Sequence, residues 1–207
     1  RSGAVATRAA LAFYIAFVTG KAQGQILKLS RGQLKDDGID FGSRKGGARV
    51  FVEWSDNLRA AVDESLAMPA SIMPMFVVHT REGGPYTSDG FKKGWQILMG
   101  QWVAGGTWAD GSKREAGERF TFHDGRAKAV TAVIEEGRKA SELTGHRLVH
   151  PGPRLVRVRM GTWGVGGGLL RHGHVRFPAD LDGPRRGRAH SASTGVIVWV
   201  WAWVAFG

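Results

Sequence analysis

Apolar residues in the first part of the chain recur at helical and strand spacing, separated by short polar turns. The stretch Ala4 to Val18 is almost entirely small or apolar, which predicts a buried helix. Thr19-Gly20 ends this helix, because glycine favours the turn that follows a helix. A second, short helix is predicted over residues 23–29, with three side chains directed inward: Ile26, Leu27 and Leu29.

Short strands are predicted after this helix. Residues 39–41 and 48–54 are rich in β-branched and aromatic residues, and the second segment places Val50, Val52 and Trp54 on one face. The loop between the two strands, residues 42–47, is rich in glycine and positive charge. A further apolar strand is predicted over residues 75–79.

Three longer helices complete the pattern. Ser55 is a favourable N-cap for a helix that Pro69 ends, and Thr87 or Ser88 caps a helix that runs to about Val103. After a polar loop over 105–117, a third helix starts at Thr121 or Phe122 and ends at Gly137, and residues 139–143 predict a short one. Helices around a small antiparallel sheet indicate an α+β domain that is mainly α. The inward-facing positions are Leu58, Ala61, Val62, Leu66, Phe91, Trp95, Leu98 and Met99.

Composition divides the chain into residues 1–147, which form one globular domain, and a tail over 148–207. The tail is rich in Gly, Arg, Pro, Val and Trp, and no helical or strand period persists in it before Val196. Because GC-rich codons favour these residues, we expect the reading frame to be lost shortly after His146, or the tail to be non-homologous. The alternative is a genuine basic low-complexity tail that binds nucleic acid. Its apolar end, Val196 to Phe206, could form an edge strand.

Charge and residue usage narrow the function classes. The formal net charge is +11, to which the tail contributes eight arginines and two aspartates, and such a charge suits a polyanionic partner or a solvated basic surface equally. The chain has no cysteine, which excludes disulfides and cysteine-based zinc sites. We expect no secretory signal, no membrane span, no metal and no cofactor.

Two histidines and an arginine form the motif with the clearest chemistry. His123 and Arg126 lie three apart at the start of a predicted helix, and Thr144-Gly-His146 follows one helical segment later. Such a group can hold and polarise a phosphate, because guanidinium and imidazole donors stabilise negative charge on its oxygens. With the basic turn at 42–49 and the helix start at 85–91, the ordered set over about residues 9–147 resembles the catalytic domain of tyrosine recombinases, the phage-integrase family.

This resemblance implies a metal-free mechanism in which a tyrosine hydroxyl attacks a DNA phosphate and forms a phosphotyrosyl link. It implies that Arg126 is the second arginine of a pair and that His123 and His146 are imidazole donors. Lys45 would be the turn lysine that protonates the leaving oxygen, with Arg44 and Arg49 as competitors.

The chain departs from the family pattern at several positions. The first arginine is replaced by Ala22 and its acidic neighbour by Gln25, and Lys21, at a helix start, is expected to point elsewhere. The nucleophile position, nine residues beyond His146, is Leu155. Gly125 stands where relatives carry leucine, so a packing contact of the helix is expected to be lost. The chain has two tyrosines, Tyr14 in the buried first helix and Tyr86 in a turn, and neither suits the nucleophile.

The sequence therefore predicts a degenerate or truncated integrase-like domain from a phage or mobile element, with impaired strand cleavage. Its partners would be double-stranded DNA and further copies on DNA. We expect a cytoplasmic location and a bacterial or phage-encoded protein. In one alternative, the protein keeps its cleavage activity by using a tyrosine from a neighbouring protomer. The other is a non-enzymatic basic nucleic-acid-binding protein, in which His123, Arg126 and His146 do not converge. The expected DNA-binding residues are Lys45, Arg49, Lys92, Lys93 and Lys128, beside Arg126.

Overall fold

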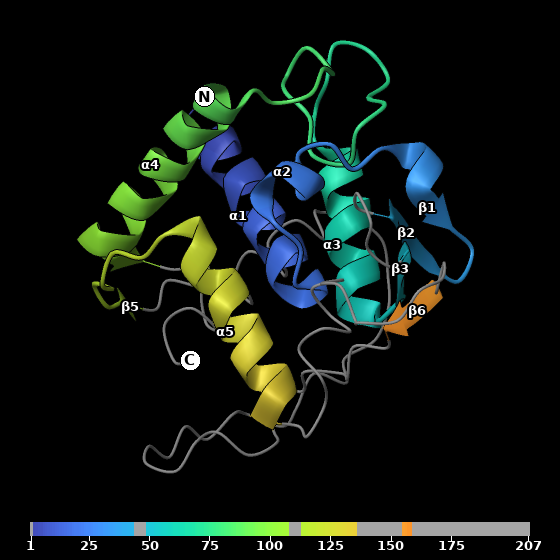
Figure 1. The fold of residues 1–207 in the computed structure, drawn as a ribbon. Coiled ribbons are helices and arrows are strands. Elements are labelled where there is room, and N and C mark those ends of the chain that lie inside the picture. The colour runs from blue at the N-terminus through green and yellow to red at the C-terminus, as the bar shows by residue number, and fades with distance from the viewer. Residues whose placement is uncertain (1, 44–48, 108–112, 136–154, 159–207) are drawn as a thin grey trace, which may run out of the picture.

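The first helix, α1 (Ser2–Thr19), forms the centre of the molecule. In this computed structural model, residues 2–43, 49–107, 113–135 and 155–158 are described. α1 contacts α3 (Asp56–Ala67), α4 (Ser88–Ala104) and α5 (Phe122–Glu135), which surround it in Figure 1. Leu11 and Ile15 are fully buried, as expected for a helix that other helices cover.

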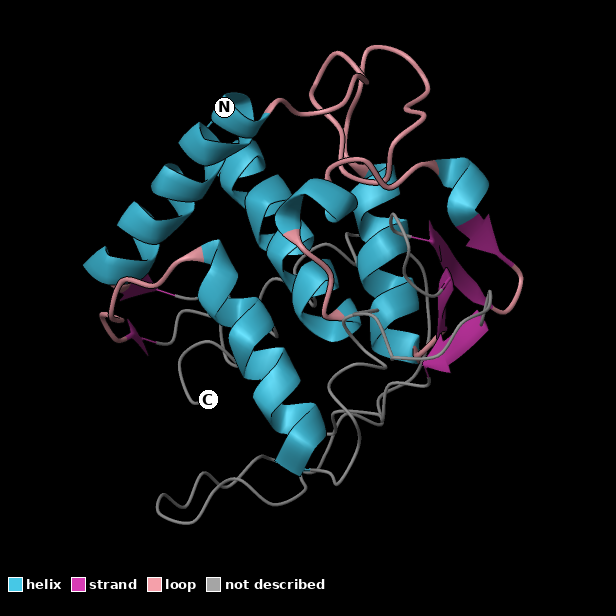
Figure 2. Cartoon of the chain, viewed as in Figure 1, coloured by secondary structure: helices cyan, strands magenta, loops and turns pink. Residues whose placement is uncertain are grey.

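A small sheet lies beside the helices, on the right of Figures 1 and 2. Its order is β1-β2-β3-β6, in which β1–β2 and β2–β3 are antiparallel and β3–β6 is parallel. The α+β, mainly α prediction is confirmed, although the sheet is mixed rather than antiparallel throughout. The strands are β1 (Leu34–Lys35), β2 (Gly38–Ser43), β3 (Arg49–Glu53) and β6 (Leu155–Val158).

The predicted helix starts agree with the structure. The Ser55 hydroxyl accepts a hydrogen bond from the Leu58 N–H at 3.3 Å, and the Thr87 hydroxyl accepts one from the Gly90 N–H at 3.1 Å. At α5, the Thr121 N–H donates to the Asp124 carboxylate at 2.7 Å, and this interaction lowers the pKa of Asp124. Side-chain caps of this kind satisfy N–H groups that the first helical turn leaves unpaired.

Three predicted elements differ from the structure. The helix predicted over 23–29 is shorter, because α2 (Gln23–Ile26) ends at a turn, although Ile26 and Leu29 are buried as expected. A 3-10 helix, η1 (Arg31–Gln33), follows it. The segment 75–79 forms no regular strand, because it pairs through two isolated bridges, Ser30 with Phe76 and His79 with Pro85. The predicted polar loop contains a small antiparallel ladder of β4 (Gly106–Thr107) and β5 (Lys113–Arg114).

The strand β6 lies in the segment where the sequence shows no persistent strand period. Four residues are too few for a persistent period in the sequence, but β6 pairs in register with β3, from Leu155 beside Arg49 to Val158 beside Val52. Val158 is 1% exposed and joins the core. The Arg157 guanidinium bonds to the Asp37 carboxylate at 2.8 Å and lies 5.0 Å from the Phe51 ring centroid. Three predicted features lie outside the described residues: the helix end at Gly137, the short helix over 139–143 and the apolar end of the tail. The structure does not test the prediction that the reading frame is lost.

Aromatic rings join α1, α4 and α5. The Phe13 ring lies 5.3 Å from Trp95, 5.4 Å from Phe120 and 5.5 Å from Phe122, measured between centroids. These rings meet at tilted or edge-on angles, which favour aromatic pairs beyond simple burial. The cluster holds the first turn of α5, and with it His123 and Arg126, against the end of the molecule where α1 terminates.

Candidate oxyanion site

A hollow of about 240 Å³ lies between the α1–α2 link and the first turn of α5. The two segments are about a hundred residues apart in the chain, and their approach follows from the packing of α5 on α1. The structure thus brings His123 and Arg126 to one hollow. The residues that line it are Lys21, Ala22, Gln23, Gly24, Phe122, His123 and Arg126.

The expectation that Lys21 points away from this place is wrong. Gly20 has a φ of 64°, a left-handed conformation that glycine adopts without strain, and the Lys21 N–H donates to the Ala16 carbonyl at 3.1 Å. The turn directs Lys21 back into the protein, where it is 1% exposed and its ammonium lies 5.2 Å from the Phe41 ring centroid. Burial, and then the positive charge of Arg126, lower the pKa of the Lys21 ammonium to about 7.

Ala22 and Gln25, at the positions of the family's first arginine and its acidic neighbour, have uncharged side chains. Ala22 is extended, with φ −70° and ψ 151°, and its N–H donates to the Gln25 side-chain oxygen at 3.3 Å. Gln25 therefore caps the short helix α2. Because the α1–α2 link carries no arginine, the cation that it contributes to the hollow is Lys21.

His123 and Arg126 lie three residues apart, within one turn, on one side of α5. His123 is exposed and Arg126 is partly buried. Among the described residues that line the hollow, none is acidic. An imidazole, a guanidinium and an ammonium around one hollow suit an anion with several oxygen atoms, because each group donates hydrogen bonds and two carry positive charge.

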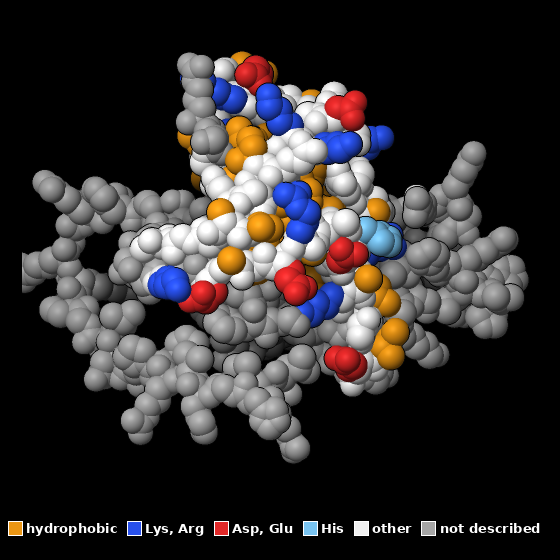
Figure 3. Space-filling view, turned by 90° about the vertical axis from the view of Figure 1, so that its left-hand side faces the viewer, with side chains coloured by type: hydrophobic (Ala, Val, Ile, Leu, Met, Phe, Trp, Pro, Cys, Tyr) orange, Lys and Arg blue, Asp and Glu red, His pale blue; other side chains and the backbone are white. Residues whose placement is uncertain are grey.

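The other predicted site residues lie elsewhere or outside the described residues. Lys45 and His146 belong to the undescribed segments, so their convergence with Arg126 stays a prediction. Lys92 and Lys93 are exposed on α4. Lys128 is partly buried on α5, and burial lowers the pKa of its ammonium. In the view of Figure 3, basic side chains lie among acidic ones rather than in one continuous basic area.

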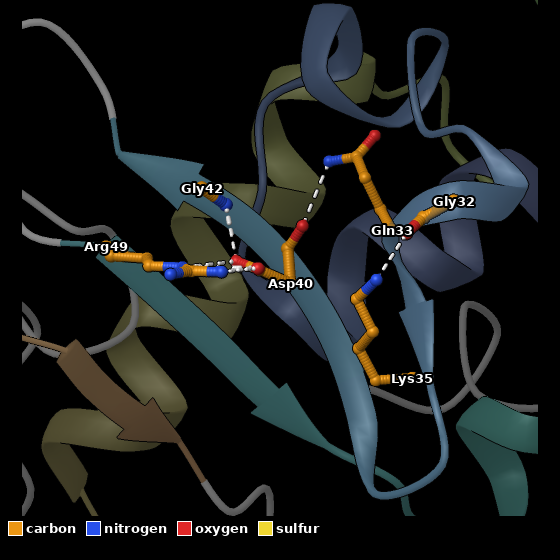
Figure 4. A network of polar contacts seen from close by, with 6 residues as sticks. All are labelled: Gly32, Gln33, Lys35, Asp40, Gly42 and Arg49. Carbon is orange, nitrogen blue, oxygen red and sulfur yellow. Dashed lines mark hydrogen bonds and ion pairs between the residues drawn. The ribbon is translucent and has the colours of Figure 1, made fainter.

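Arg49 lies across the base of the basic turn and pairs with Asp40. Its Nε atom donates to both Asp40 carboxylate oxygens at 3.1 Å, and its terminal nitrogen donates to one of them (Figure 4). The same carboxylate accepts the Gly42 N–H at 2.9 Å. Hydrogen bonds from Arg49 lower the pKa of Asp40. Arg49 thus ties β2 to β3, and its predicted role in DNA binding has this ion pair as a competitor.

Sequence reasoning missed Lys21. The signal was present as a lysine that follows a glycine at the end of a mostly apolar helix, where the chain must turn back over the core. The described residues contain no group of three or more metal-ligating side chains. No helix among them is long and apolar enough to cross a membrane.

Comparison with solved structures identifies the fold. Two structures of a lambda integrase dimer bound to a COC′ core site superpose with a TM-score of 0.50 each, at 15% and 16% sequence identity. They cover 72% and 70% of this chain, which spans 57% and 43% of theirs. The lambda integrase catalytic core gives a TM-score of 0.48 at 17% identity, covering 74% of this chain and 92% of its own. No family model and no curated protein matches the sequence. The chain therefore shares its fold with lambda integrase.

Proposed function

We propose that this chain is a phage-integrase-like DNA-binding domain of site-specific recombination, encoded by a mobile element and impaired in strand cleavage. The observation that carries the proposal is the hollow that collects Lys21, His123 and Arg126 from two distant segments. Phosphate contacts dominate protein–DNA affinity, and arginine suits them because its planar fork grips two oxygens. The shared fold supports the proposal, since the lambda integrase structures that it resembles are bound to DNA.

Impaired cleavage is proposed because the chain offers no suitable nucleophile. Its two tyrosines, Tyr14 and Tyr86, are both partly buried, and burial raises the pKa of each hydroxyl. Neither lines the hollow. Leu155, at the family's nucleophile position, lies in β6 and has no hydroxyl.

Fluorescence anisotropy with a labelled duplex tests the DNA-binding part. Arg126→Gln removes the guanidinium, and we expect it to weaken binding about tenfold, the loss of a charge-assisted contact. The matched control is Arg119→Gln, which removes the same charge from an exposed residue just before α5. Equal affinities for the Arg126→Gln protein and the unaltered chain would refute the proposed site.

A nicked suicide duplex tests the cleavage part. We expect no covalent protein–DNA adduct from the chain alone. An adduct mapped to Tyr14 or Tyr86 would contradict impaired cleavage while leaving DNA binding intact. The alternative function, a nucleic-acid-binding protein with a chance motif match, predicts instead that DNA binding is unaffected by Arg126→Gln.

A further inference from the structure

Lys21 is buried where a charged group is costly. Its residue is 1% exposed, and the Phe41 ring lies 5.2 Å from its ammonium. Transfer of an ammonium from water to a protein interior is unfavourable unless other groups compensate the charge. An aromatic face supplies part of that compensation through a cation–π contact. The charge state of Lys21 is therefore sensitive to the charges that surround it.

Lys21 and Arg126 are two positive groups at the same hollow. The charge of Arg126 disfavours the charged form of Lys21, so the two groups are within electrostatic reach of each other. An anion between them reverses this effect, because it attracts both. Among the described residues, the ionisable groups that line the hollow beside Lys21 are His123 and Arg126 from α5, and α2 contributes the neutral Gln23. The neutral ring of Phe41 in β2 lies beside the Lys21 ammonium.

The backbone holds Lys21 in a fixed place. Besides the Lys21 N–H bond to Ala16, the Gly20 N–H donates to the Phe17 carbonyl at 3.2 Å, so the end of α1 and the turn form one hydrogen-bonded unit. A residue whose backbone is held in this way needs little backbone ordering when it binds an anion.

We propose that Lys21 and Arg126 together hold one oxyanion, with Lys21 taking the place of the arginine that Ala22 lacks, and that binding is coupled to proton uptake by Lys21. This inference rests on the proposed function for the identity of the anion, a backbone phosphate of duplex DNA. The sign of the coupling follows from the low pKa of the Lys21 ammonium when no anion is bound. A nearby anion raises this pKa, so binding near neutral pH takes up a proton and strengthens as the pH falls through about 7.

The test measures binding of a labelled duplex and, separately, of inorganic phosphate at several pH values. Lys21→Met keeps an unbranched side chain, one heavy atom shorter, and removes its charge. The matched control is Lys28→Met, the same change at an exposed lysine just after α2. For the unaltered chain and the Lys28→Met protein, we expect affinity to rise several-fold from about pH 8 to about pH 6. For the Lys21→Met protein, we expect weaker binding, by about tenfold at the lower pH, and a smaller rise.

A His123→Gln variant removes the imidazole from the hollow and leaves Lys21 in place. Calorimetry in two buffers of different ionisation enthalpy counts the protons taken up. Uptake that persists in His123→Gln and disappears in Lys21→Met supports the proposal. Uptake and affinity that are unchanged in Lys21→Met overturn it.

The two probes distinguish this inference from the proposed function. Phosphate binding that depends on Lys21, without any duplex binding, would support the oxyanion site and refute the DNA-binding function. Duplex binding that depends on Arg126 but not on Lys21 would support the function and refute this inference. If Lys21→Met unfolds, the Lys21 side-chain NMR signal in the unaltered chain replaces it. Its titration midpoint should rise when phosphate is added, and an unmoved midpoint refutes the proposal.

Discussion

The ring of Phe13 occupies the space that a side chain at Gly125 would need. A Cβ atom built on Gly125 would come within 2.3 Å of the Phe13 Cε2 atom, far inside van der Waals contact. The sequence pattern predicts a lost helix contact at Gly125, and this prediction is wrong, because Phe13 of α1 fills the place from the opposite side. The α5 helix that carries His123 and Arg126 is therefore packed and not loosened at this position.

Gly125→Leu should destabilise the protein, by roughly 1–3 kcal/mol, because the leucine must displace the Phe13 ring. Urea unfolding followed by circular dichroism measures this change. The control is Gly100→Ala in α4, where nothing lies within 4 Å of an added Cβ, so alanine should stabilise by about 0.5–1 kcal/mol. The double variant Phe13→Ala, Gly125→Leu should lose less stability than the sum of the losses in the two single variants. Strict additivity would contradict the contact.

Lys21→Met should stabilise the fold as well as weaken anion binding. The folded state lowers the pKa of Lys21 from 10.5 to about 7, so the unfolded chain binds a proton that the folded chain does not, between those values. Stability of the unaltered chain should therefore fall as the pH drops from about 10.5 to about 7, and a few kcal/mol are at stake, since each pKa unit is about 1.4 kcal/mol. Thermal melts of Lys21→Met should lack this fall, whereas Lys28→Met should retain it.

Glu64 on α3 should make stability depend on pH in the acidic range. Its two carboxylate oxygens are shielded from solvent and have no hydrogen-bond partner among the described residues, and burial raises its pKa from 4.5 to about 7. Burial disfavours the charged form of Glu64 and not its protonated form. The free energy of unfolding should therefore decline as the pH rises from about 4.5 to about 7. Glu64→Gln should flatten this decline in chemical unfolding. The neighbouring exposed Asp63→Asn should leave it in place, and a decline that survives Glu64→Gln would contradict the burial.

Asp40→Asn separates the two roles of Arg49. The change weakens the ion pair that ties β2 to β3, so the melting temperature should fall slightly, because an ion pair with an exposed arginine contributes little stability by itself. If Arg49 also binds DNA, its release from Asp40 should strengthen duplex binding while the fold is weakened. Arg49→Gln should then weaken both. Unchanged duplex affinity in the two variants would assign Arg49 to the hairpin alone.

Removal of β6 should destabilise the sheet. A chain ending at residue 147 loses the pairing with β3, the burial of Val158 and the contacts of Arg157 with Asp37 and Phe51. We expect a lower urea midpoint than for the full chain, and a smaller loss for Arg157→Gln, because exposed ion pairs contribute little by themselves. Equal midpoints for the full and shortened chains would mean that residues 148–207 are a separate appendage, as their composition suggests.

Local signals in the sequence sufficed for the helices. The N-caps Ser55 and Thr87 and the apolar run of α1 each act within a few residues, so the pattern predicts them well. The contacts that needed the whole fold were missed. β6 is stable only beside β3, and Gly125 is explained only by Phe13, more than a hundred residues earlier.

The candidate site was predictable where it depends on local spacing, and not where it depends on the whole fold. His123 and Arg126 lie on one turn of a helix, so their spacing alone brings them together. The place of Lys21 depends on the left-handed turn at Gly20 and on the docking of α5, and neither follows from spacing. The family pattern directs attention to position 22, which is Ala22, whereas the turn at Gly20 brings Lys21 into the hollow.

The salt dependence of duplex binding is the most direct measurement of whether the hollow holds a DNA phosphate. The logarithm of the binding constant falls linearly with the logarithm of salt concentration, with a slope set by the phosphates that are neutralised. Arg126→Gln should reduce this slope by about 1, whichever DNA sequence is used. Arg119→Gln should leave it closer to that of the unaltered chain. A slope that Arg126→Gln does not change would contradict a phosphate in the hollow.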